Sequence, residues 1–251
     1  MDTEETVEVV CLDAGNTLVG MRFERIAALL ARVGIWTSAA ALERAEARAR
    51  PVVSQHLAGG RSSEDSDTGV VQVRCVLEGI GVPAAVAAAQ APQLARRIRA
   101  ELPSRRLWTR VLPGVPAALQ LLRTVGLRLV VVSNSDGTLE ALLEDVGLRG
   151  LVDEVIDSAV VGVEKPHPAI WTTVLADLGV PPARAIHVGD LYAVDVAGAR
   201  AAGLEAVLLD PFGDWGETDC PRLPDLAAFA RAFAAGGGAP RGEAQRCKLG
   251  S

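Results

Sequence analysis

The pattern of hydrophobic and polar positions divides most of the chain into two kinds of segment, which alternate. Short apolar runs rich in β-branched residues predict buried strands, and stretches with apolar residues three and four positions apart predict helices. The predicted strands are residues 7–12, 127–132, 155–156, 185–188 and 206–209, and the predicted helices between them are 115–125, 139–146, 167–178 and 192–202. This alternation indicates an α/β fold in three layers, with a parallel sheet between two layers of helices.

The segment between the first two predicted strands has a different pattern. Apolar residues recur at helical spacing from about residue 21 to 104, interrupted by a polar stretch at 59–67 that predicts a loop. We therefore expect a core formed by residues 1–19 and 106–235, with a helical insert at 20–105. The last residues, 236–251, lack periodicity and are expected to be a disordered tail.

Charge and composition restrict the class of partner. The net charge of −6 argues against binding to nucleic acid or anionic membranes, which requires concentrated positive charge, so a small molecule is the expected partner. No uninterrupted apolar run reaches the roughly 18 residues that a membrane span needs, and the first residues are acidic, so we expect a cytoplasmic protein. The oligomeric state is left open between monomer and homodimer. The four cysteines are too scattered for a zinc knuckle or a disulfide framework.

Polar side chains stand where the predicted strands end. Asp13, Ser133 and Asp190 each follow an apolar run closely, and the carboxyl ends of parallel strands are where such sheets bind ligands. Lys165 is also conspicuous, because only one other lysine occurs among 25 basic residues. The sequence therefore predicts a site at one edge of the sheet.

Four segments in this order strengthen that prediction: CLDAGNTL, VVVSNSDG, GVEKPHP and HVGDLYAVDVAGARAAG. Together they resemble the four motifs of the haloacid dehalogenase-like superfamily, in particular its subfamily IA-like members with a helical C1-type cap inserted after the first motif. The resemblance covers residues 7 to about 235. It implies a Rossmann-like core with a cap, and a Mg²⁺-dependent phosphohydrolase that acts on a small phosphorylated metabolite through an aspartyl-phosphate intermediate.

The resemblance also assigns a role to each residue. Asp13 is the expected nucleophile, since a carboxylate can attack phosphorus when cations shield its charge. Ser133, Asn134 and Thr17 are expected to bind the phosphoryl group, the first two at a strand-to-helix turn where amides converge on an anion. Lys165 would neutralise both the nucleophile and the phosphoryl group. For Asp13 and Ser133 alone, turn formation and helix capping are the competing interpretations.

The expected metal site comprises Asp13, Asp190 and the backbone carbonyl of Gly15, because Mg²⁺ prefers hard oxygen ligands. Asp195 would orient Lys165 or support the metal ligands from behind. The competing interpretation is a helix-capping role for Asp190 and a surface position for Asp195. His187 is expected to be a half-buried structural residue.

Gly15 departs from the family pattern, because most phosphatases of this superfamily carry a second aspartate, the general acid and base, at that position. Three alternatives follow: a 2-haloacid dehalogenase, a phosphonate-cleaving enzyme and a catalytically degenerate member that binds a ligand or a protein. The paired Asp190 and Asp195 disfavour the first, and the absence of lysine between residues 18 and 108 excludes the Schiff base of the second. The retained motif residues disfavour the third. If active, the enzyme is expected to prefer good leaving groups, such as aryl or acyl phosphates or phosphoanhydrides.

Overall fold

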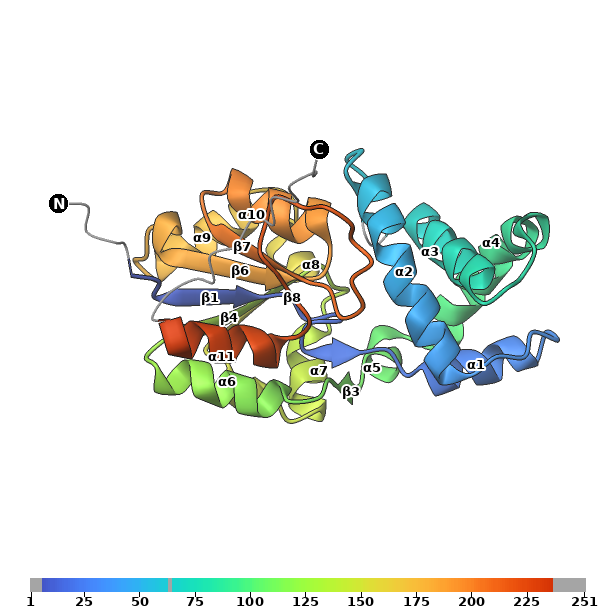
Figure 1. The fold of residues 1–251 in the computed structure, drawn as a ribbon, viewed down its shortest axis with the longest axis horizontal. Helices are drawn as coiled ribbons and strands as arrows, with labels where there is room; N and C mark the ends of the chain where they lie inside the picture. The colour runs from blue at the N-terminus through green and yellow to red at the C-terminus, as the bar shows by residue number, and fades with distance from the viewer. Residues whose placement is uncertain (1–5, 63–64, 237–251) are drawn as a thin grey trace, which may run out of the picture.

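The core of the protein is a six-stranded parallel sheet (Figure 1). The computed structural model describes residues 6–62 and 65–236. The strand order is β5-β4-β1-β6-β7-β8, so β1 lies at the centre of the sheet. Strands β4 and β5 follow on one side of β1, and strands β6, β7 and β8 follow on its other side. The strands are β1 (Val9–Leu12), β4 (Arg128–Ser133), β5 (Glu154–Asp157), β6 (Ala185–Gly189), β7 (Glu205–Leu209) and β8 (Arg222–Leu223).

Helices cover both faces of the sheet because its central strands are apolar on both sides. Along β4, Leu129 and Val131 face one apolar cluster, and Val130 and Val132 face the other. The first cluster includes side chains of α6 (Val115–Thr124), α7 (Leu139–Asp145) and α11 (Leu226–Gly236). The second includes side chains of α9 (Ala169–Asp177) and α10 (Ala197–Ala201). Short turns complete the core: α8 (Ser158–Val161), η1 (Arg149–Leu151), η2 (Pro182–Arg184) and η3 (Tyr192–Val196).

The inserted segment forms a helical lobe beside the carboxyl end of the sheet (Figure 1). Its helices are α1 (Phe23–Ala31), α2 (Ala39–Leu57), α3 (Ser66–Gly79), α4 (Ala84–Glu101) and α5 (Ser104–Leu107). They enclose a separate apolar cluster that includes Phe23, Leu42 and Leu77. A short antiparallel pair, β2 (Val19–Gly20) and β3 (Arg110–Val111), connects this lobe to the core.

The α/β prediction, with a parallel sheet and a helical insert, is confirmed. The predicted loop at 59–67 ends earlier than expected, because α3 begins at Ser66. Residues 63–64 of this loop lie outside the described residues. The predicted tail at 236–251 also lies outside them, except for Gly236. The proposed boundaries of core and cap remain a prediction. Within the described residues, no helix is long and apolar enough to cross a membrane.

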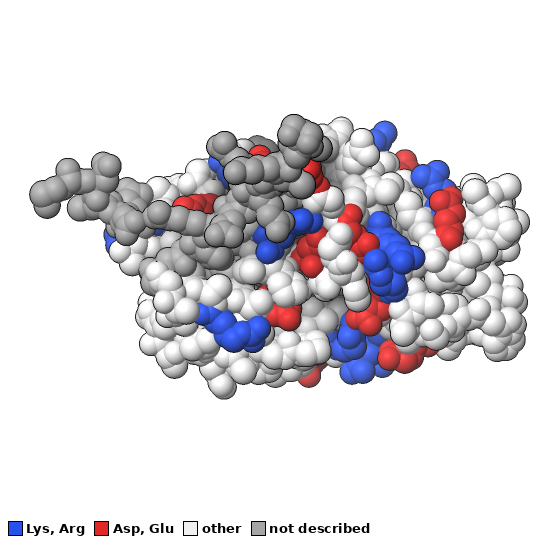
Figure 2. All heavy atoms as spheres, in the orientation of Figure 1, with Lys and Arg blue, Asp and Glu red and all other residues white. Residues whose placement is uncertain are grey.

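Ion pairs join the two lobes. Arg44 of α2 donates to both carboxylate oxygens of Asp214 in the segment after β7, one of these bonds measuring 2.7 Å. Arg110 of β3 pairs with Glu43 of α2. Acidic and basic side chains are interspersed along the junction on the face drawn in Figure 2. The contacts therefore hold α2 close to the strand ends.

Candidate active site

Three neighbouring strands deliver the predicted site residues to one place. Strand β1 pairs with β4 on one side and β6 on the other, in parallel. Ser133 is therefore at the end of β4, Asp13 just after β1 and Asp190 just after β6. The backbone N–H of Asp13 donates to the carbonyl of Val188 at 2.9 Å, which extends the ladder past the end of β1. The strand order thus creates the convergence that the sequence predicted.

The carboxylate of Asp13 is buried and held by two donors. Its Oδ1 lies 2.6 Å from Nζ of Lys165 and accepts a hydrogen bond from Oγ of Ser133 at 3.2 Å. Burial raises the pKa of Asp13 above its ordinary value, while Lys165 opposes that shift. The ammonium group is therefore what stabilises the carboxylate form at this buried position.

Lys165 bridges two carboxylates. Its Nζ lies 2.7 Å from Oδ1 of Asp195 as well as 2.6 Å from Asp13, and the side chain is almost fully buried. Burial lowers the pKa of Lys165, but the carboxylates of Asp13 and Asp195 raise it by more, so the net shift is upward. The lysine is therefore a fixed positive charge rather than a proton donor at neutral pH.

Asp195 lies on the π-helical turn η3 and faces back to the end of β6. Its Oδ2 accepts hydrogen bonds from the backbone N–H groups of Asp190, at 3.1 Å, and Leu191, at 2.9 Å. A Cβ on Gly189 would lie 2.3 Å from Cγ of Asp195, so this close approach requires glycine. Asp195 is thus wedged between Lys165 and the turn that carries Asp190.

His187 supports Asp195 from within the core. It is completely buried, not half-buried as expected, because it lies on central strand β6. Nε1 of Trp171 donates to Nδ1 of His187 at 3.2 Å, which leaves Nε2 as the protonated nitrogen that donates to Asp195 at 3.1 Å. Burial lowers the pKa of His187, in agreement with this neutral form.

Asn134 positions the backbone of Lys165. Its Oδ1 accepts from the N–H of Lys165 at 2.7 Å, and its Nδ2 donates to the carbonyl of the same residue at 2.9 Å. The side chain therefore ties the end of β4 to the loop that carries the lysine. Thr17 follows Asn16 but is not itself among the residues that line the cavity: it is buried, and its hydroxyl has no hydrogen-bond partner among the described residues.

Three residues that the sequence interpretation left out surround Asp190. Nδ2 of Asn16 donates to Oδ2 of Asp190 at 3.1 Å and to Glu46 at 3.2 Å. Arg50 pairs with Glu46 at 2.8 Å and with Asp190 at 3.3 Å. The spacing of Glu46 and Arg50, four residues apart on α2, was a visible signal of a helical ion pair, but only the docking of α2 reveals what the pair faces.

Burial raises the pKa of Asp190 to about 8; Arg50 opposes this shift and the carboxylate of Asp13 adds to it. Two buried carboxylates and a nearby backbone carbonyl are a donor set that suits Mg²⁺, which usually retains several waters. Among the described residues, no three His, Cys, Asp or Glu side chains form a more complete cage. The residues present therefore fit a hydrated Mg²⁺ ion better than a zinc site.

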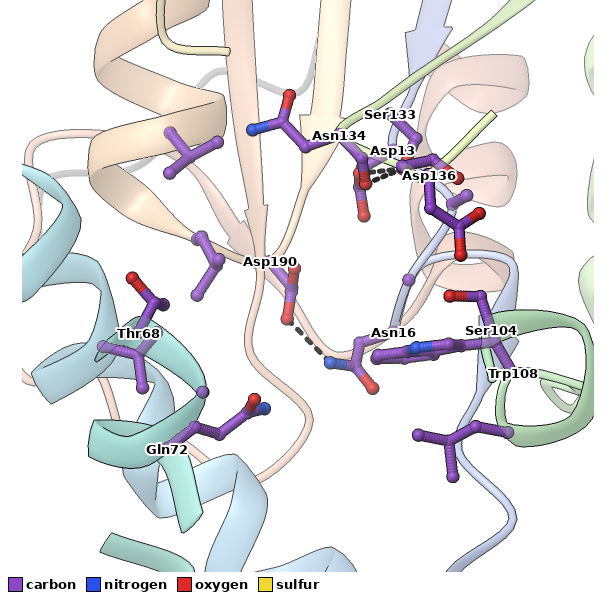
Figure 3. Close-up of a pocket in the computed structure, with 18 of the residues that line it drawn as sticks. Asp13, Asn16, Thr68, Gln72, Ser104, Trp108, Ser133, Asn134, Asp136 and Asp190 are labelled. Atoms are coloured by element: carbon purple, nitrogen blue, oxygen red, sulfur yellow. Dashed lines mark hydrogen bonds between the residues drawn. The ribbon is translucent and has the colours of Figure 1, made fainter. Parts of the chain in front are cut away.

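A cavity of about 440 Å³ opens between the strand ends and the helical lobe. Figure 3 shows Asp13, Ser133 and Asn134 together on one side, Asn16 and Trp108 on another, and Thr68 and Gln72 of α3 across from Trp108. The helical lobe contributes apolar side chains, including Val53, Leu57, Val73, Ile98 and Leu102, and also the polar or charged side chains of Glu46, Arg50, Thr68, Gln72 and Arg99. The cavity is therefore polar at the sheet and has both apolar and polar walls at the lobe.

Comparisons with known proteins agree with this arrangement. Residues 7–203 match the family profile described as haloacid dehalogenase-like hydrolase. A 118-residue segment, 47% of this chain, is 37% identical to haloacid dehalogenase-like hydrolase domain-containing protein 3 of Xenopus laevis and covers 48% of it. A 122-residue segment, 48% of this chain, is 37% identical to ribulose-1,5-bisphosphate 5-phosphatase of Halopiger xanaduensis and covers 50% of it. The matches thus span about half the length of these curated relatives.

Solved structures share the fold over nearly the whole chain. The putative hydrolase YfnB of Bacillus subtilis, bound to magnesium, is 18% identical with a TM-score of 0.58, covering 92% of this chain and 98% of that one. A 2-haloacid dehalogenase from Pseudomonas syringae is 20% identical with a TM-score of 0.53, covering 91% and 99%. At these identities the likeness shows the fold alone.

Proposed function

The chain belongs to the haloacid dehalogenase-like hydrolase family, and from this we propose that it is a Mg²⁺-dependent phosphohydrolase that acts on a small phosphorylated metabolite. One observation carries the proposal: the Asp13 carboxylate stands at the centre of the strand ends, 2.6 Å from the Lys165 ammonium group and beside the second carboxylate Asp190. The phosphatase names of relatives, such as the bisphosphate phosphatase of Halopiger xanaduensis, support phosphoryl chemistry.

In the proposed reaction, an Asp13 oxygen forms a bond to phosphorus while the bond from phosphorus to the leaving oxygen breaks. Water then attacks the aspartyl phosphate, which releases phosphate and regenerates the carboxylate. Lys165 and Ser133 hold the Asp13 carboxylate, and the Lys165 charge would also offset that of the phosphoryl oxygens. Asp195 keeps the lysine in position by its second ion pair.

Asp13, Asp190 and the carbonyl of Gly15 would hold the metal ion. When bound, Mg²⁺ supplies positive charge to the phosphoryl oxygens and to the attacking carboxylate. Nδ2 of Asn16 donates to Asp190, and the guanidinium group of Arg50 forms an ion pair with it. Burial raises the pKa of Asp190 by more than the neighbouring Arg50 lowers it.

A 2-haloacid dehalogenase remains the second candidate, because an enzyme of that type shares the fold. The buried acidic pair of Asp190 and Asp195 disfavours it, since halide displacement from carbon needs no metal site. Release of chloride from 2-chloropropionate in EDTA would support that candidate.

Release of phosphate from p-nitrophenyl phosphate, with Mg²⁺ and with EDTA, tests the proposed function. We expect turnover that requires Mg²⁺ and falls at least roughly 10³-fold in Asp13→Asn, which removes the attacking group. Asp214→Asn is the matched control: it changes an aspartate that pairs with Arg44 away from the cavity lining. Turnover that persists in Asp13→Asn would contradict the proposal.

A further inference from the structure

The side chain that lies nearest to Gly15 is that of Trp108. Gly15 is not among the residues with positive φ, so its backbone conformation is open to any L-residue. A Cβ built there would lie 3.3 Å from Cζ3 and 3.4 Å from Cη2 of Trp108. The six-membered ring of Trp108 thus occupies the space into which a side chain at position 15 would extend.

Trp108 is held in this place by both lobes of the protein. It follows α5 directly, and its backbone N–H donates to the carbonyl of Ser104 at 2.9 Å. Its half-buried side chain packs against the apolar cluster of the core and against that of the helical lobe. Figure 3 shows the indole alongside Asn16, facing the cavity opposite Thr68 and Gln72.

We propose that Trp108 and Gly15 form a steric pair, in which the indole fills the space that an acid–base side chain at position 15 would occupy. The indole then serves as an aromatic wall for the leaving group, and the site therefore takes aryl phosphates. The inference rests on the proposed function and names its substrate class.

Two features of the cavity support this class. Without a carboxyl group at position 15 to donate a proton, the leaving oxygen must depart as an anion, which a phenol, with a pKa of about 10, does far more readily than an aliphatic alcohol. The leaving group also has to fit a space that the indole bounds on one side and that Val73 and Ile98 of the lobe, together with Thr68 and Gln72, bound on the other. A planar aromatic ring can stack on the indole and bury its apolar surface there.

Binding of two phosphonates that are not hydrolysed tests the aromatic wall, with calorimetry as the readout. Phenylphosphonate offers a planar ring, and cyclohexylphosphonate offers a ring of similar size that is not planar. We expect Trp108→Leu, which keeps apolar bulk, to weaken phenylphosphonate binding roughly three- to tenfold and cyclohexylphosphonate binding much less. Trp108→Phe should retain most of the preference. The control Trp36→Ala removes a tryptophan that is 82% exposed and should change neither.

Thermal unfolding tests the steric pair. Gly15→Ala adds only a Cβ, so it should lower the unfolding midpoint when Trp108 is present and lower it clearly less in the Trp108→Leu background, where the neighbouring side chain can move aside. The same drop in both backgrounds would overturn the steric pair. Equal binding of phenylphosphonate by the wild type and Trp108→Leu would overturn the aromatic wall. Neither the binding measurement nor the unfolding measurement depends on turnover. Failure of the proposed function is therefore distinguishable: the wild type would be inactive and would still bind the two phosphonates with different affinities.

Discussion

Lys165 is the residue on which both the site and the local stability depend most. It separates two buried carboxylates, Asp13 and Asp195, that would otherwise repel each other without a compensating charge. We expect Lys165→Met to abolish turnover and to lower the free energy of unfolding by about 3–5 kcal/mol, the usual cost of breaking a buried ion pair from one side. Urea denaturation measures this, with the exposed pair variant Arg105→Met as control. A destabilisation no larger than that of the control would contradict the electrostatic account.

The buried His187 should make the free energy of unfolding depend on pH. Because burial lowers its pKa in the folded protein, the unfolded chain binds the proton more readily. Its contribution to stability is therefore complete above the unfolded pKa of about 6.5 and is lost as the pH falls toward the folded pKa.

We expect the unfolding free energy of the wild type to fall more between pH 6.5 and 5 than that of His187→Gln. Other groups, including Asp190, titrate in both proteins, so the difference between the two curves isolates the histidine. His167→Gln, which changes an exposed histidine, should follow the wild type. Parallel curves for wild type and His187→Gln would show that the ring is not held neutral in the fold.

Helix α2 contacts the turn η3, which carries Asp195. Oγ of Ser54 accepts a hydrogen bond from the backbone N–H of Ala193 at 2.8 Å, and this serine is buried. The bond reaches the same turn, η3, that carries Asp195. The position of α2 and the geometry around Asp195 are thus directly linked.

Ser54→Ala should therefore speed hydrogen exchange at the Ala193 amide and lower stability by about 1–3 kcal/mol, because that N–H loses its partner. Ser38→Ala is a matched control on the same helix: it removes the N-cap acceptor of Ala41, which costs about 1 kcal/mol, and should leave exchange at Ala193 unchanged. Equal acceleration in both variants would indicate general loosening of α2 rather than a specific contact.

The strands and the positions of their polar ends were predictable, because buried strands and strand-to-helix turns leave local signals. The apolar run before Asp13 and the one before Asp190 placed both residues at the edge of the sheet. Contacts between lobes left no such signal. Arg50, Glu46 and Trp108 were not singled out from the sequence, since the residues that they contact across the two lobes are distant in the sequence. The complete burial of His187 was also missed, because periodicity does not identify the central strand of a sheet.

The helical lobe reaches the proposed metal site at the strand ends. Arg50 from the helical lobe lies 3.3 Å from the Asp190 carboxylate, where a bound cation would compete with it. We expect Mg²⁺ to raise the unfolding midpoint of the wild type relative to EDTA, by mass action on the folded state. The increase should be lost in Asp190→Asn and retained in Asp219→Asn, a substitution at an exposed ion pair. An equal increase in all three proteins would place the metal elsewhere.

We propose that Asp13 forms a covalent phosphoryl intermediate, which mass spectrometry of the protein can detect after rapid acid quenching during turnover of p-nitrophenyl phosphate with Mg²⁺. We predict one phosphoryl group on the peptide that contains Asp13, and none in Asp13→Asn. Turnover without that label, or a label on another residue, would contradict the account.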